Sequence, residues 1–187
     1  MPLPSHKHSE KSTLAGVLAI FKRKLAQDLD GQLPAKVISY DRIKNVAKVQ
    51  PLIKVILTSG KVKSRAMIAA VPVLALGGGG FCVTFPLKAG DTGWIEASDR
   101  DISLFVKSLV ESIPNTYRTH DFSDSRFIPD VFTKYTYSSA DSADMVIQSL
   151  DGTTKINIGP SGIKLTHPVL ISLNAPTVLK NGSSIKT

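Results

Sequence analysis

Residues 145–187 alternate apolar and polar side chains over short runs, with no helical pattern among them. Such alternation predicts strands with one apolar face, and turn residues separate the runs at 151–152, 159–162 and 181–182. The candidate core positions of this segment are Ile156, Ile158, Ile163, Leu165, Val169, Ile171 and Leu173. About 40 residues of isolated β-structure bury too little surface to persist alone, so something else must cover this face.

Two coverings are open for the C-terminal segment. Several identical copies, intertwined around one axis, would bury each apolar row and leave no free sheet edge. Alternatively, the segment packs on the rest of its own chain. The small, polar run 138–144 is typical of a linker and favours separation, so self-association is the preferred interpretation.

An amphipathic helix is predicted for residues 13–29, after a polar arm at 1–11. Ser12 or Thr13 supplies an N-cap and Gly31 a stop. The apolar positions at helical spacing are Leu14, Val17, Leu18, Phe21 and Leu25. This stripe has to lie on something, and it packs either on its own domain or on a partner or symmetry mate.

The middle of the chain is rich in β-prone residues. Five strands are predicted within about 65 residues, at 35–40, 46–58, 62–71, 81–85 and 92–97, followed by a short helical pattern. Pro51 inside the second strand favours an edge or a bulge there. Five strands and one short helix fit a five-stranded barrel of the OB type better than a sandwich of about seven strands.

Residues 112–144 show no sustained period and are predicted to be an irregular connection laid over the barrel. The expected organisation is therefore all-β with an N-terminal helix. Residues 1–32 form the arm and helix, 33–111 the OB-fold domain, 112–144 the connection, and 145–187 the self-associating β segment.

The charge of the chain is uneven. Its 23 Lys and Arg against 15 Asp and Glu give +8, and residues 1–65 hold 13 of the basic residues but 4 of the acidic ones. A basic end suits nucleic acid, a membrane surface or an acidic protein. Nucleic-acid binding by an OB barrel also needs aromatic stacking platforms, and Tyr40 is the one aromatic between residues 35 and 75. An OB-fold nucleic-acid-binding protein therefore stays as the alternative function.

Catalytic and metal-binding signals are weak. Cys82 is the single cysteine and lies in an apolar, β-prone run, which favours a buried, inert thiol. The tetraglycine 77–80 lacks the features of a phosphate-binding loop, and His120, Asp121 and Asp124 fit a loop that satisfies its own backbone. We expect no enzyme activity, cofactor or metal, although paired carboxylates of a carbohydrate-active enzyme can form in space.

Several stretches of the chain resemble a known family. They are 34–41, 71–74, the glycine-rich turn, Gly-Asp-Thr-Gly-Trp-Ile at 90–95 with Ser-Asp-Arg-Asp-Ile at 98–102, and His-Asp-Phe-Ser-Asp at 120–124. Together they are similar to the N-terminal OB domain of central spike proteins from contractile phage tails. The resemblance covers about 100 residues, 33–132, and segment 90–102 is its most specific part.

The resemblance implies a mechanical function in the tail baseplate of a virion. In such spikes, three OB domains form a collar and three C-terminal chains wind into a rigid, intertwined β-helix or β-prism. The homotrimer caps the tail tube and is driven through the host outer membrane when the sheath contracts. By this resemblance the 13–29 helix is the candidate contact with the hub or tail tube, and residues 145–187 are the spike.

Two departures from the family pattern matter. Many such spikes carry a His-x-His near the C-terminus that binds iron in three copies, but here His167 has no histidine two residues away. We therefore expect no tip metal. The spike segment is also short, which leads us to expect a separate tip protein.

Overall fold

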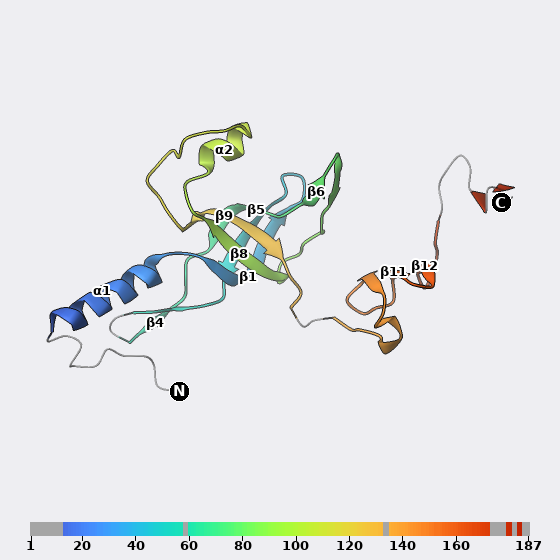
Figure 1. Cartoon of the computed structure of the whole chain (residues 1–187), viewed down its shortest axis with the longest axis horizontal. Helices are drawn as coiled ribbons and strands as arrows, with labels where there is room; N and C mark the ends of the chain where they lie inside the picture. Colours follow the sequence, from blue (N-terminus) through green and yellow to red (C-terminus); the bar gives the residue numbers. More distant parts are fainter. Residues whose placement is uncertain (1–12, 58–59, 133–134, 173–178, 181–182, 185–187) are drawn as a thin grey trace. The chain divides into compact units, whose positions relative to one another are not determined.

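The computed structural model describes residues 13–57, 60–132, 135–172, 179–180 and 183–184. It divides into two compact units, Met1–Val131 and Phe132–Thr187 (Figure 1). The first unit contains α1 (Leu14–Asp28), β1 (Gln32–Asp41), β2 (Val46–Pro51), β3 (Val55–Ile56), β4 (Val62–Lys63), β5 (Ile68–Pro72), β6 (Leu76–Gly78), β7 (Phe81–Val83), β8 (Thr92–Ser98), α2 (Ser103–Ser108) and β9 (Asp121–Pro129). The second contains a 3-10 turn (Ser139–Asp141), β10 (Met145–Gln148), β11 (Lys155–Gly159), β12 (Gly162–Thr166), β13 (Leu179–Lys180) and β14 (Ser183–Ser184).

Five strands of the first unit form a nearly closed antiparallel barrel in the order β5-β2-β1-β8-β9 (Figure 1). Its two edges meet where Val73 and Phe127 form a parallel bridge. The Leu74 amide donates to the Phe127 carbonyl at 2.8 Å in the same place. The predicted β-rich fold with a five-stranded, OB-like barrel is therefore confirmed.

The barrel core comes from alternate positions of its strands. The fully buried large side chains are Val37, Val49, Ile95 and Phe127. They are joined by Ala35, Ala47, Val71, Val73 and Phe122. These small and branched residues fill the interior of a small barrel with period-two alternation, and the first unit therefore buries its own core within one chain.

The predicted membership of the barrel was partly wrong. Segments 32–41, 46–51, 68–72 and 92–98 are barrel strands. Val62–Lys63 instead pairs with Val55–Ile56, and Phe81–Val83 pairs with Leu76–Gly78, each in a separate hairpin. Gly79 and Gly80 make its turn with positive φ of 59° and 87°, which glycine adopts without steric cost. Pro51 ends β2, where it pairs with Ala35.

The fifth barrel strand is β9, which lies inside the segment predicted to be an irregular connection. It pairs with β8 along Trp94–Ile128 and Ile95–Phe127. The domain predicted for 33–111 therefore extends through β9. The strand escaped detection because its apolar residues are interrupted by a bulge and by a polar run at 123–126.

The most specific part of the family-like sequence has a structural explanation in this barrel. A Cβ on Gly93 would lie 2.3 Å from the Ile128 carbonyl oxygen and 2.6 Å from Cζ of Phe127, so β8 can approach β9 only with glycine there. Asp91 closes the preceding turn, because its carboxylate accepts the Lys88 amide at 2.7 Å. Gly90 adopts φ of 100° in that turn.

The second unit contains a three-stranded antiparallel sheet, β10-β11-β12, and a short β13-β14 pair. Its boundary also corrects the sequence prediction, since residues 132–144 belong to this unit and not to a linker. Asp141 and Asp144 hydrogen-bond to Asn157 of β11, and this contact ties the polar run to the sheet.

Candidate assembly surfaces

The β10-β11-β12 sheet has one wholly apolar face. The ladder pairs Met145 with Ile158 and Ile147 with Ile156, and it then pairs Ile156 with Leu165 and Ile158 with Ile163. Directly paired residues project from the same side of a sheet. The apolar face therefore consists of Met145, Ile147, Ile156, Ile158, Ile163 and Leu165, whose exposed fractions range from 38% to 72%.

The opposite, polar face of the same sheet is covered by its own chain. Asn157 is 3% exposed, and its amide donates to Asp141 at 2.8 Å and to Asp144 at 3.2 Å. Lys155 pairs with Asp141, and a Cβ on Gly159 would collide with the Asp144 carboxylate. The sheet thus covers the centre of its polar side and exposes its apolar side, the reverse of the usual arrangement.

The pKa of Asp141 follows from these contacts. The hydrogen bond from Lys155 and then that from Asn157 hold the pKa of this carboxyl below its ordinary value, against the opposing effect of burial. The charged form of Asp141 is therefore part of what fixes the 3-10 turn on the sheet.

The structure brings together four of the seven candidate core residues. Ile156, Ile158, Ile163 and Leu165 lie on the apolar face. Val169 and Ile171 follow β12 and lie outside any strand of the single chain, and their place in an intertwined core stays a prediction. His167 turns the chain there, because its Nδ1 accepts the amides of Val169 and Leu170 at 3.2 and 3.0 Å. Leu173 lies outside the described residues.

Two members of the apolar face, Met145 and Ile147, were missed by the sequence prediction. The signal was present, because Met145-Val146-Ile147-Gln148 alternates in the same way as β11 and β12. Their place on the face depends on the register of β10 against β11, which the alternation alone does not fix.

Helix α1 forms a second apolar surface, here called the helix stripe: Leu14, Val17, Leu18, Phe21 and Leu25. Thr13 caps the helix, since its Oγ1 accepts the Gly16 amide at 3.1 Å. The stripe residues are 50% to 77% exposed, so the described part of the chain does not cover them. Of the two interpretations left open by the sequence, this favours a partner or symmetry mate over the helix's own domain. The contact with a hub stays a prediction.

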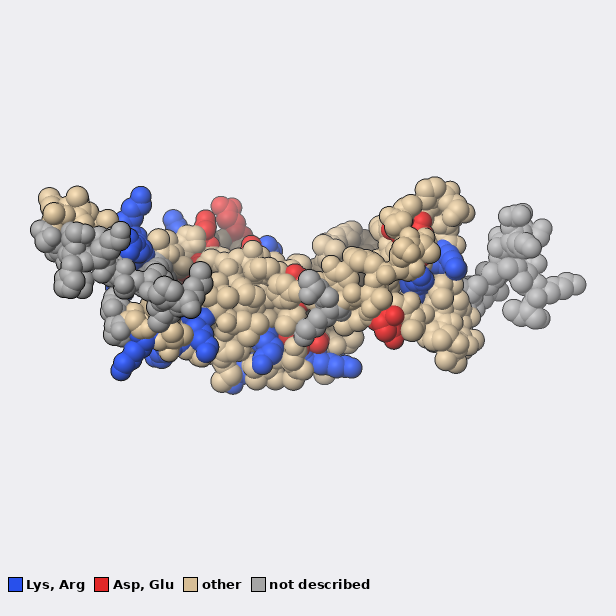
Figure 2. Space-filling view, turned by 90° about the horizontal axis from the view of Figure 1, so that it is seen from below, with Lys and Arg blue, Asp and Glu red and all other residues tan. Residues whose placement is uncertain are grey.

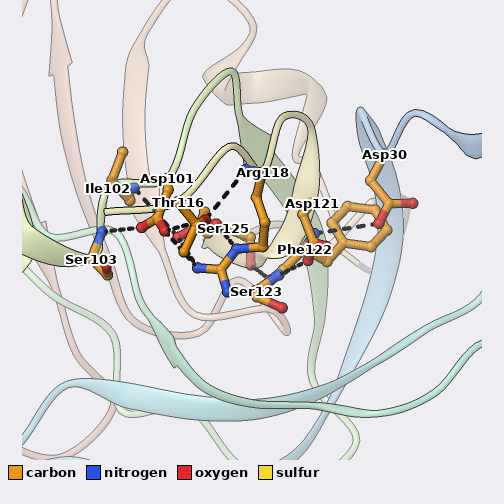
Figure 3. Close-up of polar contacts among 11 residues, drawn as sticks. Asp30, Asp101, Ile102, Ser103, Thr116, Arg118, Asp121, Phe122, Ser123 and Ser125 are labelled. Carbon is orange, nitrogen blue, oxygen red and sulfur yellow. Dashed lines mark hydrogen bonds and ion pairs between the residues drawn. The ribbon is translucent and has the colours of Figure 1, made fainter. Parts of the chain in front are cut away.

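A polar cluster holds the long loop between β8 and β9 (Figure 3). Asp101 accepts the Ser103 amide at 2.9 Å and the Thr116 hydroxyl at 2.7 Å. Arg118 contacts Asp101 at 3.1 Å and Asp124 at 3.0 Å. Both carboxylates are buried, so this cluster, the loop clamp, ties the start and the end of the loop to β9.

Charge and hydrogen bonds keep the loop clamp ionised. Hydrogen bonds from Ser103 and Thr116, with the Arg118 charge adding to them, hold the pKa of Asp101 well below its ordinary range. The hydrogen bond to Asp124 raises the pKa of Arg118. Paired charges that are also hydrogen-bonded are a structural arrangement, which gives Asp101 of the Ser-Asp-Arg-Asp-Ile segment a structural role.

The loop that the clamp holds carries exposed apolar side chains. They are Phe105, Val106, Leu109, Val110, Ile113 and Tyr117. Sequence reasoning found the short helix here, but not this surface. Arg100, Pro114 and Tyr117 also line an open hollow of about 500 Å³ beside the clamp.

The predicted chemical candidates are dispersed in the structure. Asp121 accepts the Ser123 amide at 2.7 Å, His120 lies 3.5 Å from Asp99, and Asp124 belongs to the loop clamp. Cys82, expected to be buried, is exposed in the β6-β7 hairpin. Among the described residues, no group of three or more His, Cys, Asp or Glu is placed to hold a metal ion. No described helix is long and apolar enough to cross a membrane.

The basic excess lies on the surface of the barrel unit. In Figure 2, Lys and Arg side chains of this unit lie mainly along its lower edge. Among these basic residues, Arg65 makes a structural contact, since it pairs with Asp30 at 2.7 Å and lies over the Phe122 ring.

A comparison with known protein families identifies the same segment of the chain that forms the barrel. The family model described as phage protein Gp138 N-terminal domain matches residues 33–130, more than half of the chain. The chain belongs to this family. The matched range runs from β1 to the end of β9, so the part of the chain that matches the family is the barrel. Membership supports a structural role in a phage particle. No curated protein matches the chain.

Proposed function

We propose that this protein is the central spike of a contractile phage tail. Three copies form a collar of barrels at the baseplate end of the tail tube, in contact with its hub. Their C-terminal segments intertwine into a short needle. Sheath contraction drives the needle through the host outer membrane, and the protein acts mechanically and not as an enzyme.

The observation that carries this proposal is the inverted sheet of the second unit. Its apolar face is bare in one chain, while its polar face is already occupied by Asp141 and Asp144. The apolar face is therefore the side of the sheet that is left for a partner to cover. Further copies of the same face, arranged around an axis, cover it without leaving an edge.

The energy available from such burial is large. Fully burying a Val, Leu, Ile or Met side chain contributes about 1.5–3 kcal/mol. The apolar face offers six such side chains in each copy, part of whose surface is already covered. A needle needs stiffness, and interlocked strands with paired backbone groups supply it.

The needle's apex is a further part of the proposal. No tip metal is proposed, because His167 uses its Nδ1 to hold the turn after β12 and has no neighbouring histidine ligand. A separate tip protein would cap so short a needle.

Labelling of assembled particles tests the proposed location. An epitope is inserted at Ser161, in the exposed turn between β11 and β12, and antibody-labelled phage are imaged by electron microscopy before and after contraction. The proposal expects label on the tail axis at the distal end of the baseplate. Label on the capsid or along the sheath would contradict it, and particles without the insertion control for background.

A further inference from the structure

The helix stripe contains a coiled-coil seam. Leu14, Leu18, Phe21 and Leu25 follow one another at spacings of four, three and four residues. This is the alternation of d and a positions in a heptad repeat. Leu18 and Leu25 then occupy a positions, and Leu14 and Phe21 occupy d positions.

The seam is exposed along its length. Its four residues are 52% to 77% exposed, although α1 is a 15-residue helix. Helices of this length are marginal in water without tertiary packing. The barrel core lies elsewhere and is complete without them, so the seam has to be covered from outside the described part of the chain.

The flanking residues suit parallel copies of the same helix. In this register Val17 and Lys24 are g positions and Lys22 is an e position, while the next e position would fall at Leu29, beyond the end of α1. Across a parallel seam, each g residue faces the e residue of the next heptad. Val17 therefore meets Lys22. No lysine faces a lysine, and the lysine stems can lie over apolar side chains.

The C-terminal end of α1 is fixed to the barrel. The Asp30 amide donates to the His120 carbonyl at 2.8 Å, and its carboxylate pairs with Arg65. Gly31 continues the connection, since its carbonyl accepts the Ala97 amide at 2.9 Å. The base of each helix is therefore held at a fixed point on its own barrel.

We propose that the helix stripe is occupied by the same stripe of two further copies, forming a short, parallel, three-stranded coiled coil. The number of copies rests on the proposed trimer. This contact would add, at the N-terminal end of the chain, to the association made by the apolar face of the C-terminal sheet.

Disulfide trapping in the full-length protein tests this proposal. Cys82 is the single cysteine, so Cys82→Ser gives a cysteine-free background. Leu18→Cys and Phe21→Cys place a thiol in the seam, and Ala19→Cys and Ala26→Cys place one on the exposed b positions beside it. Each variant is oxidised mildly and its chains are separated under denaturing, non-reducing conditions. The mass of the unoxidised protein is measured by light scattering.

The expected result is a trimeric mass, with a shift from the single-chain to the linked-pair band for the seam variants only, because thiols link when their Cα atoms come within about 7 Å. A trimeric mass without seam-specific linkage would overturn the coiled coil and leave the stripe to the hub, with the proposed spike intact. A monomeric mass would overturn both proposals.

Discussion

The barrel and the β10-β12 sheet share the same strand alternation but differ in what covers their apolar side chains. In the barrel, Val37, Val49 and Ile95 are no more than 1% exposed. In the sheet, the corresponding side chains are at least 38% exposed, and Asn157 is the buried residue. A single chain therefore covers the apolar side chains of one unit and leaves those of the other bare, and the second unit is the part that we propose assembles.

The largest expected effect is on assembly. Ile163→Asp places a charge on the apolar face of every copy, and an unpaired buried charge costs several kcal/mol. We expect the trimer to dissociate, measured as a threefold fall in mass by light scattering. Ser161→Asp, in the exposed turn between β11 and β12, is the matched control and should keep the mass. Equal behaviour of both variants would mean that the apolar face is not the interface.

The next effect is confined to the barrel. Phe127→Ala removes a fully buried ring and should lower the free energy of unfolding of this unit by about 3–5 kcal/mol. Phe81→Ala is the control, because Phe81 is 85% exposed, and it should change stability by less than about 0.5 kcal/mol. Denaturant unfolding measures both, and similar losses from the two variants would refute the assigned core.

A smaller, local effect is expected at the loop clamp. Asp101→Asn removes the charge that pairs with Arg118 and one acceptor of the hydrogen bonds from Ser103 and Thr116. The loop between β8 and β9 should open more often, and limited proteolysis within 104–115 should accelerate while the barrel stays folded. Asp99→Asn should leave cleavage unchanged, because Asp99 is exposed. Unchanged cleavage in Asp101→Asn would show that the clamp does not hold the loop.

The smallest effect is a pH dependence in the second unit. Contacts with Lys155 lower the pKa of Asp141 in the folded state. Its stabilising contribution is therefore present above the ordinary aspartate pKa of about 4, and it is lost as the pH falls through the lowered folded value. The difference in melting temperature between wild type and Asp141→Asn should be constant from about pH 5 to 8 and shrink below about pH 4. A difference that grows on acidification would contradict this assignment.

Local patterns predicted much of the barrel, and the exceptions have physical causes. β1, β2 and β8 were identified because their branched residues alternate over long runs. β9 was missed because Ser123–Arg126 interrupts its pattern, and its strand state depends on pairing with β8. Phe81–Val83 has strong β propensity, but tertiary pairing decides which sheet a strand joins.

The sequence predicted most of the residues that form the two apolar surfaces, but not what covers or exposes them. Alternation identified Ile156, Ile158, Ile163 and Leu165 as one face. The opposite face is covered because Asp141 and Asp144 accept hydrogen bonds from Asn157. The alternation of residues in the sequence does not predict this contact. The exposure of the helix stripe is also a property of the whole fold, because the same spacing occurs in helices that pack on their own domain.

The mass of the intact wild-type chain in solution tests the central claim most directly. The protomer is 20.1 kDa, and light scattering over a dilution series should give three times that value at every concentration at which the second unit is folded. A monomer with a folded, stable second unit would contradict the claim. The apolar face would then need no further copies, and the nucleic-acid-binding alternative for the barrel would take precedence.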